Sequence, residues 1–183
     1  MTGKLSGVMH NDLDLTLGAM RARSWSVVLL QRRRKKPSGK HWKVTDDPEI
    51  AERHMRHGGN LGLMCHESNG LAALDADDVE AWNEMTSALD ERLEKPWVKS
   101  GSGKFHYYVK WEPDLPAKLF WQGKKVGEIQ RGPGQQQVVL PPSIHPDGGR
   151  CQWLVDPASE PLLPLPGTWR AYLRGFTYAS IRR

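Results

Sequence analysis

The sequence predicts a mixed α+β protein in which helices flank a sheet around one core. Three observations support this fold class. Segments with apolar residues three or four apart alternate along the chain with short β-branched or alternating segments. A length of 183 residues suits one domain. A hydrophobic content of 38% with eight tryptophans supplies the apolar surface for an ordered core.

The first sixty residues predict a helix, a strand and a second helix. A helix is expected from about Asn11, which can cap it, because apolar residues follow at helical spacing. Residues 25–30 are apolar and β-branched, which predicts an interior strand that leads to a turn at residues 36–40. The segment 45–59 predicts a helix, with an aspartate cap, Pro48 in its first turn and glycine past its end.

The central part of the chain predicts two strands, a helix and a third strand. Residues 60–66 and 70–77 are expected as strands joined by a hairpin-like or bulged connection. Apolar residues from Val79 onward recur at helical spacing and predict an amphipathic helix that ends before Pro96. Residues 105–111 alternate, so that His106 and the aromatic stripe lie on opposite faces of a strand. Further strand candidates are residues 125–131, 135–142 and 150–155.

Charge and composition limit the classes of binding partner and the cellular compartment that we expect. The net charge of +5 and the pI near 9.3 favour polyanionic partners. No segment approaches the ~20 apolar residues of a membrane span and no signal peptide is evident, so a cytoplasmic protein without membrane contact is expected. Two cysteines cannot form a disulfide framework and are expected to pack as thiols. The one dense basic run is Arg32, Arg33, Arg34, Lys35 and Lys36, a candidate phosphate-binding segment or a solvated face.

An acidic cluster ends the strand predicted at residues 70–77. Side chains two apart on a strand point the same way, so Asp75 and Asp77 are expected to project from one face while Ala76 points back. Two carboxylates so placed repel unless a cation lies between them. Their hard oxygen ligands suit Mg²⁺ or Mn²⁺. The alternative is that Asp77 or Asp78 only caps the next helix.

Two other stretches carry polar groups suited to an anion. The segment SGSGKFHYY has a glycine-rich turn beside Ser102, Gly103 and Lys104, and then His106. It is no Walker loop, because the lysine leads into a strand and not a helix. The later segment offers Glu128, a third carboxylate, which could equally be a solvated strand residue paired with a lysine. It continues with Arg131 and then with the rigid turn PPSIHP, which contains Ser143 and His145.

A zinc site is the competing interpretation of the histidines. His54, His57, Cys65 and His66 lie within thirteen residues. Their spacing matches no standard structural zinc pattern, and a helix C-terminus favours histidine through its dipole. We therefore do not expect zinc.

In order, these stretches resemble the primase-polymerase (Prim-Pol) branch of the archaeo-eukaryotic primase superfamily, which is common in phage and plasmid replication proteins. The resemblance spans roughly residues 25–155. The stretches that carry it are KKPSGKHW with TDDPEIAERHM, NLGLMCHESNGLAALDADD, SGSGKFHYYV, and GEIQRGPGQQQVVLPPSIHPDGGRCQW. It implies an RRM-like catalytic sheet flanked by helices and a smaller α/β unit. Residues 1–167 would form the catalytic domain, and residues 168–183 a basic tail or a linker to a missing domain.

The resemblance also implies roles for particular residues. Asp75, Asp77 and Glu128 would hold Mg²⁺ or Mn²⁺, in a pair of ions, and His106 would contact the phosphates of the incoming nucleotide. Further nucleotide contacts would come from Ser102, Gly103, Lys104, Arg131, Ser143 and His145, and DNA contacts from residues 32–36. Two departures from the family pattern concern these contacts: Lys104 stands where many relatives have a second glycine, and the glutamine run replaces an aromatic-containing strand.

The expected activity is primer synthesis, and extension, from NTPs or dNTPs on a single-stranded DNA template, with a replicative helicase as a candidate partner. Two alternatives stay open. The same carboxylates could serve a metal-dependent nuclease or phosphoesterase. The aromatic strand and the basic run could instead belong to a noncatalytic single-strand binder, although such a binder gains nothing from three acids beside an anionic ligand. The choice between ribo- and deoxynucleotides, the start site, the preferred metal and the oligomeric state are not encoded in recognisable motifs.

Overall fold

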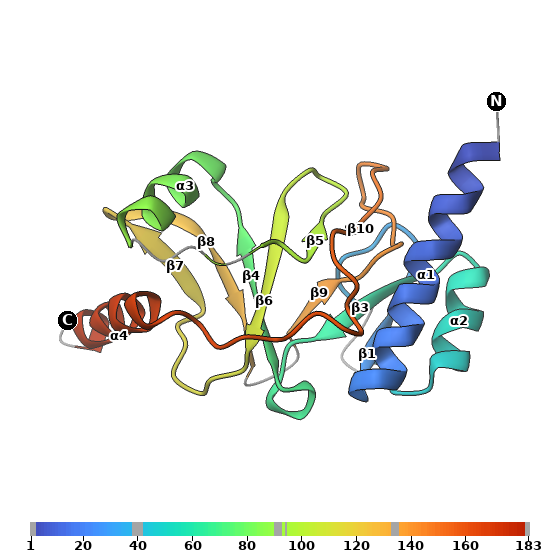
Figure 1. The fold of residues 1–183 in the computed structure, drawn as a ribbon, viewed down its shortest axis with the longest axis horizontal. Coiled ribbons are helices and arrows are strands. Elements are labelled where there is room, and N and C mark those ends of the chain that lie inside the picture. Colours follow the sequence, from blue (N-terminus) through green and yellow to red (C-terminus); the bar gives the residue numbers. More distant parts are fainter. Residues whose placement is uncertain (1–2, 38–41, 90–92, 94, 133–135, 182–183) are drawn as a thin grey trace.

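The computed structural model describes residues 3–37, 42–89, 93, 95–132 and 136–181, and these form two antiparallel sheets with helices outside them (Figure 1). This arrangement confirms the predicted α+β class. Parts of the turn expected at residues 36–40 and of the glutamine run lie outside the described residues. Among the described residues, none of the helices combines the length and the apolar character needed to cross a bilayer.

The smaller sheet has four strands in the order β2-β1-β3-β9. Their bounds are Val44–Thr45, Val27–Leu30, Asn60–Met64 and Gln137–Val139. Helices α1, Gly3–Arg23, and α2, Pro48–Arg56, lie together beside this sheet (Figure 1). Asp47 caps α2 by accepting a hydrogen bond from the Glu49 amide at 2.8 Å, as the aspartate–proline signal predicts. Helix α1 begins earlier than the expected start at Asn11.

The larger sheet has six strands in the order β10-β5-β6-β4-β8-β7. Their bounds are Gln152–Trp153, Val98–Lys99, Phe105–Lys110, Leu71–Ala76, Lys124–Gln130 and Lys118–Trp121. Helix α3, Val79–Ala88, begins where β4 ends, and α4, Gly167–Ile181, follows the proline-rich segment. Both helices lie on the side of this sheet that faces away from the smaller sheet (Figure 1).

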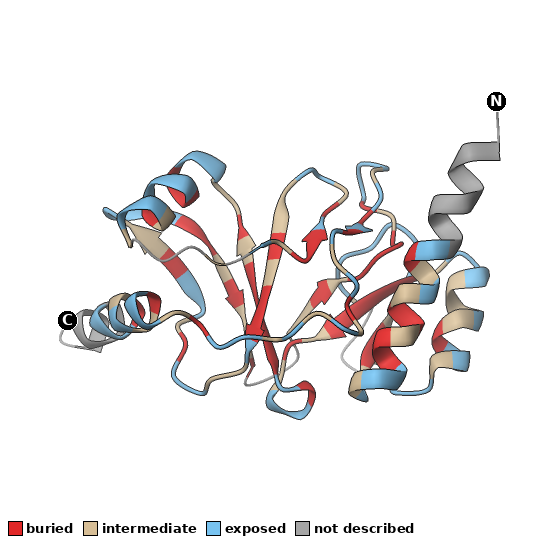
Figure 2. Ribbon diagram, viewed as in Figure 1, coloured by how far each residue is buried: buried red, intermediate tan, exposed pale blue. Residues whose placement is uncertain are grey.

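The two faces of the larger sheet belong to different cores, because side chains alternate along each strand. On β4, Leu71 and Ala73 pack into a core shared with α1, α2 and the smaller sheet. The intervening Ala72 and Leu74 pack into a second core with α3 and α4. Buried residues accordingly follow the strands through the middle of the molecule in Figure 2. Strand β4 therefore lies between the two cores, and its inner face looks toward the smaller sheet.

The expected hairpin-like connection between residues 60–66 and 70–77 is wrong. Strands β3 and β4 belong to different sheets, and the 3-10 helix η1, Glu67–Asn69, joins them. The Asn69 side chain holds this crossing in place, because its amide donates to the Ser26 and Met64 carbonyls at 2.9 Å each and its oxygen accepts from the Ser26 amide. Two apolar strands close in sequence predict a hairpin by proximity alone, and here the buried asparagine redirects the chain.

The C-terminal segment contributes to the core at its start. Trp169 and Leu173 of α4 are buried in the second core, and the Tyr172 hydroxyl donates to the Phe120 carbonyl at 2.6 Å. The first turns of this segment therefore pack on the larger sheet. The proposed division of the chain after residue 167 stays a prediction.

Candidate active site

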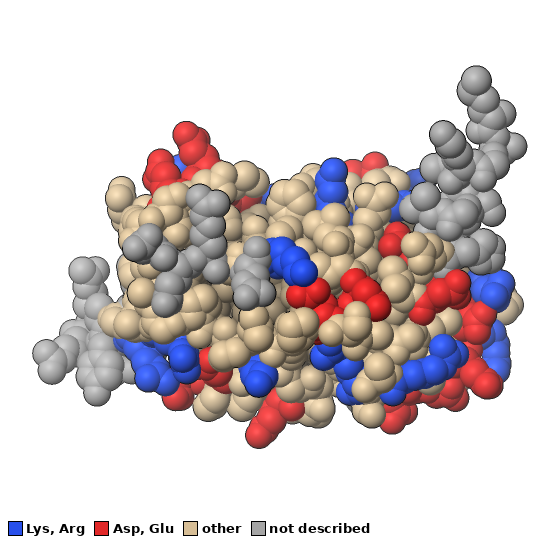
Figure 3. All heavy atoms as spheres, viewed as in Figure 1, with Lys and Arg blue, Asp and Glu red and all other residues tan. Residues whose placement is uncertain are grey.

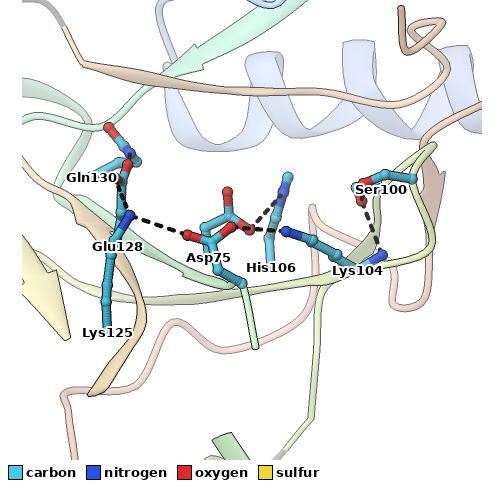
Figure 4. Close-up of polar contacts among 9 residues, drawn as sticks. Asp75, Ser100, Lys104, His106, Lys125, Glu128 and Gln130 are labelled. Carbon is cyan, nitrogen blue, oxygen red and sulfur yellow. Dashed lines mark hydrogen bonds and ion pairs between the residues drawn. The ribbon is translucent and has the colours of Figure 1, made fainter. Parts of the chain in front are cut away.

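Three neighbouring strands bring Asp75, His106 and Glu128 into one row. In the register of the larger sheet, Asp75 on β4 lies opposite His106 on β6 and opposite Glu128 on β8. Residues directly opposite on antiparallel strands share a face, with Cβ atoms about 5 Å apart. Figure 4 shows these side chains on the same side of the sheet.

Asp77 joins the row from just beyond the end of β4. Its backbone amide donates to the Val126 carbonyl at 2.9 Å, which keeps the chain against β8 for one more residue. Ala76 points into the second core, so Asp75 and Asp77 both point inward and line the same cavity. The capping alternative applies to Asp78, whose carboxylate accepts from the Ala81 amide at 3.1 Å.

The cavity lies between the two sheets and has a volume of about 450 Å³. Strands β4, β6 and β8 supply its acidic wall. Strand β9 and the basic residues Lys35 and Lys36 supply the opposite wall. The lining residues from the acidic side are Asp75, Asp77, His106, Glu128, Gln130, Ser100, Ser102 and Lys104. Those from the other side are Lys35, Lys36, Trp42, Gln136, Gln137, Val138, Val139, His145 and Cys151.

Two lysines pair with two of the three carboxylates, Asp77 and Glu128. Asp77 accepts from the Lys104 ammonium at 2.9 Å, and the Lys125 ammonium lies 2.7 Å from Glu128 and 3.4 Å from Asp77 (Figure 4). Burial raises the pKa of Asp77, but the hydrogen bonds and charges of the two lysines outweigh it, so this pKa lies below its ordinary value. The hydrogen bond to Glu128 in turn raises the pKa of Lys125. One cation therefore already serves two of the carboxylates.

His106 is the buried member of the row, with 6% of its surface exposed. Burial lowers its pKa from the ordinary value, the Asp75 carboxylate opposes that shift, and the charge of Lys35 adds to it. The ring is therefore neutral at pH 7. Its Nε2 lies 3.8 Å from Asp75 Oδ1, and its buried Nδ1 has no hydrogen-bond partner among the described residues.

The glycine-rich turn is closed by its own hydrogen bonds. The Ser100 amide donates to the Lys104 carbonyl at 2.7 Å, and the Gly103 amide donates to the Ser100 carbonyl at 2.9 Å. Gly103 has a φ of +86°, a conformation that favours glycine. Its amide is thus used within the turn, and Gly103 does not line the cavity. The turn instead holds Ser102 there, with its hydroxyl 3.0 Å from that of Ser100.

Of the other expected nucleotide contacts, His145 lines the cavity and two residues do not. The His145 Nδ1 accepts from the Asp147 amide at 3.2 Å, which leaves its buried Nε2 without a partner among the described residues. Ser143 is fully buried, and its hydroxyl accepts from the Leu61 amide at 2.9 Å. The Arg131 guanidinium donates to the carbonyls of Pro113 and Gly132, outside the cavity.

The basic run is divided by the fold. Lys35 and Lys36 line the cavity. Arg32, Arg33 and Arg34 line a separate hollow on the outside. A run of five like charges in the sequence thus faces two different places.

Several residues that line the cavity or contact its carboxylates carried no sequence signal strong enough to single them out. Lys125 precedes Glu128 by three residues on an expected strand, so its pairing with Glu128 depends on a local departure from strict alternation. Gln137 belongs to the glutamine run, and its side-chain amide donates to the Lys35 carbonyl. Trp42 and Ser100 reach the cavity only because distant segments meet there.

The carboxylate row fits a hard divalent ion by its chemistry. Asp75, Asp77 and Glu128 offer oxygen ligands on one wall, and the shared contact of Lys125 marks a position that suits positive charge. As they stand, no three His, Cys, Asp or Glu side chains in the described part of the chain are grouped closely enough to hold a metal ion. Asp77 and Glu128 would therefore have to exchange their lysine partners to bind one.

The histidines considered as zinc ligands each contact a different group in the structure. The His54 ring contacts the Leu30 carbonyl at 2.7 Å, and His57 contacts the Arg53 carbonyl at 2.7 Å. His66 caps the 3-10 helix through the Ser68 amide. Burial raises the pKa of the Cys65 thiol far above its ordinary value, which disfavours the thiolate that a metal requires.

Comparison with known proteins identifies one matching family model and a similar solved structure. The family model of the N-terminal domain of bifunctional DNA primase/polymerases, Prim-Pol, matches residues 17–168. Among solved structures, the AEP domain of the primase-polymerase of cyanophage S-2L is similar, with 14% sequence identity and a TM-score of 0.48. The similarity covers 90% of this chain and 97% of that one. None of the curated proteins compared with this chain matches it. Because the family model spans most of its length, the chain belongs to the Prim-Pol family.

Proposed function

We propose that this protein catalyses metal-dependent, template-directed nucleotidyl transfer, making primers on single-stranded DNA and extending them. The observation that carries the proposal is the convergence of Asp75, Asp77 and Glu128 on one cavity, with a neutral, buried His106 beside them. Membership in the Prim-Pol family supports the same reaction class.

The carboxylates would hold Mg²⁺ or Mn²⁺, as one ion or a pair. In nucleotidyl transfer such ions activate the attacking 3′-hydroxyl and stabilise the pyrophosphate that leaves. Asp75 and Glu128 lie on paired strands of the antiparallel sheet, and Asp77 directly follows β4 with its amide bonded to the Val126 carbonyl, which keeps the relative positions of the carboxylates defined. Asp77 is already ionised well below neutral pH, so no proton has to leave it before a cation binds.

Other cavity side chains would bind and orient the nucleotide. His106 Nδ1 and His145 Nε2 are buried ring nitrogens without partners among the described residues, and a ligand in the cavity could supply the missing hydrogen bonds. Ser102 offers a hydroxyl at the same wall. Lys104 would move from Asp77 toward the triphosphate once a metal ion takes its place at the carboxylate.

The proposed substrates are a single-stranded DNA template and NTPs or dNTPs. The basic residues 32–36 supply positive charge for phosphates beside the cavity. A replicative helicase is the partner we propose on the basis of family membership, because primer synthesis has to follow the opening of a duplex.

A primer-synthesis assay on circular single-stranded DNA tests the proposal. Labelled NTPs or dNTPs are supplied with Mg²⁺ or Mn²⁺, and products are compared for the wild type and Asp75→Ala/Asp77→Ala. The proposal expects template-dependent products from the wild type and none from the double variant, which should remain folded by circular dichroism. Synthesis retained by the double variant contradicts it. Degradation of the template without incorporation would identify a nuclease instead.

A further inference from the structure

The basic run at residues 32–36 bends sharply just outside the smaller sheet. The Arg34 amide donates to the Gln31 carbonyl at 3.0 Å, and Arg33 has a φ of +56°, so the chain reverses directly after β1. Beyond the bend, the Asn60 side-chain amide donates to the Arg34 carbonyl, and that of Gln137 to the Lys35 carbonyl. These contacts attach the second half of the run to β3 and β9.

The arginines before and at the bend line a hollow of about 600 Å³ on the outer surface. Gln31, Pro37 and Pro146 complete the wall with the five basic residues, so every ionisable group among its described lining residues is a cation. None of these cations forms an ion pair with a described acidic residue. On the face drawn in Figure 3, by contrast, acidic and basic side chains are interspersed. The hollow is therefore a local concentration of unpaired positive charge.

The two lysines lie on the boundary between the hollow and the cavity. Lys35 and Lys36 line both, whereas Arg32, Arg33 and Arg34 line only the hollow. His106 and Cys151 also line the cavity, and the charge of Lys35 acts to lower the pKa of both, adding to the effect of burial at His106 and opposing it at Cys151. The lysine charges thus face the same space as the carboxylate row.

The three arginines and the two lysines differ in their chemistry as well as in their positions. Guanidinium groups form paired hydrogen bonds with phosphate oxygens and suit a phosphodiester backbone, which they bind without reading bases. Ammonium groups act as compact point charges that a polyphosphate can share. In the part of the chain that the structure describes, no aromatic side chain lines the hollow, so none there offers a surface on which a base could stack.

We propose that the basic run serves two ligands: Arg32, Arg33 and Arg34 bind the phosphodiester backbone of single-stranded DNA in the outer hollow, while Lys35 and Lys36 bind the triphosphate of the incoming nucleotide in the cavity. This division rests on the proposed nucleotidyl-transfer function. It places the border between the template path and the nucleotide site between Arg34 and Lys35, just after the bend.

Two variants that each remove two positive charges test the division, Arg32→Gln/Arg33→Gln and Lys35→Gln/Lys36→Gln. Binding of fluorescein-labelled oligo(dT) is measured by anisotropy over a range of salt concentrations. Binding of a fluorescent ATP or dATP analogue is measured without DNA in the presence of Mn²⁺. Thermal unfolding of both variants, which change exposed side chains only, checks that they are folded.

The arginine variant should bind oligo(dT) roughly tenfold more weakly and reduce the slope of log K against log[salt] by about 1.4, as for two lost phosphate contacts. Its nucleotide affinity should stay within twofold of the wild type. The lysine variant should lose roughly tenfold in nucleotide affinity with a smaller loss for oligo(dT). Arg32→Lys/Arg33→Lys, which keeps the charge, should retain most of the oligo(dT) affinity.

Equal losses for both ligands in both variants would overturn the division, since they would reflect only the summed charge. No loss in either variant would overturn it as well. Incorporation measured on the same samples separates this inference from the proposed function. A crossed binding pattern in a wild type that never incorporates nucleotides would leave the division standing and refute the polymerase.

Discussion

The inner face of β4 has an apolar end and an acidic end, and the two ends differ in what lies across from them. Leu71 and Ala73 are fully buried against the smaller sheet and helices α1 and α2. Asp75 and Asp77, the next two inward positions, face a cavity and keep about a third of their side-chain surface exposed. The four residues follow one another at intervals of two and point to the same side of the sheet. The two pairs therefore differ only in their side chains and in what surrounds them.

This difference shows how one sheet can serve as core and as site. The sheets close on each other where the inward residues are apolar, and remain apart where the inward residues are carboxylates that would be costly to desolvate. Changes at the apolar end should therefore act on stability, and changes at the acidic end on activity. The following substitutions test that separation.

The largest expected effect is the loss of activity in Asp75→Asn. Removing one charged group that acts on the reacting phosphates should lower the incorporation rate by roughly 10²–10³-fold. The free energy of unfolding should change by less than about 0.5 kcal/mol. Denaturant titration and a primer-extension assay measure the two quantities, and Asp114→Asn, at an exposed loop position, is the matched control. A destabilised Asp75→Asn protein would show that the acidic end also supports the fold.

The complementary change at the apolar end is Leu71→Ala. Truncating this fully buried leucine should lower the free energy of unfolding by about 2–5 kcal/mol. Incorporation per folded molecule should remain close to that of the wild type at temperatures well below the unfolding midpoint. Leu163→Ala, at a position with 40% exposure, should change stability much less. If Leu71→Ala lost activity while still folded, the two ends of the strand would not be separable.

Gly127→Ala tests the join between β4 and β8. A Cβ at Gly127 would lie 2.2 Å from the Asp75 carbonyl oxygen, so β8 would have to shift next to Glu128. We expect a loss of about 1–3 kcal/mol in unfolding free energy and a loss of activity with the carboxylates unchanged. Gly18→Ala, at a helical position with open space around the added carbon, should be neutral or stabilising. Wild-type activity in Gly127→Ala would mean that the spacing of Glu128 from Asp75 does not matter.

The smallest effect is expected for Lys125→Met. This substitution removes the cation that contacts both Asp77 and Glu128, so the pKa of Asp77 should rise toward its ordinary value. The unfolding temperature should fall slightly at low salt, and added Mn²⁺ should raise it more than in the wild type. Differential scanning fluorimetry with and without Mn²⁺ measures both shifts, with Lys110→Met as the control at another exposed strand position. An equal Mn²⁺ response in both variants would indicate that Lys125 and the ion do not compete.

The shared direction of Asp75 and Asp77 could be predicted from the sequence, because side chains along a strand alternate with a period of two. That rule is local, and it correctly places Asp75 and Asp77 on one face with Ala76 on the other. The position of Glu128 next to Asp75 depends instead on which strands pair and in which register. Here the family resemblance, and not the periodicity, brought Glu128 into the set.

A different reason explains why two residues expected at the nucleotide do not line the cavity. Ser143 and Arg131 were expected at the nucleotide, yet their polar groups satisfy backbone groups elsewhere in the fold. The split of the basic run at Lys35 also depends on long-range contacts, through the side chains of Asn60 and Gln137. Hydrogen bonds between segments distant in sequence leave no pattern in the local spacing of residues, so they could not be predicted.

Mn²⁺ anomalous scattering would show whether Asp75, Asp77 and Glu128 share a divalent ion. Crystals grown with Mn²⁺ and a nonhydrolysable nucleotide would be measured near the manganese edge. The account predicts an anomalous peak roughly 2.0–2.6 Å from oxygen atoms of these carboxylates, lost in crystals of Asp75→Asn/Asp77→Asn. A bound nucleotide with no peak there, or with the ion held by other residues, would contradict it.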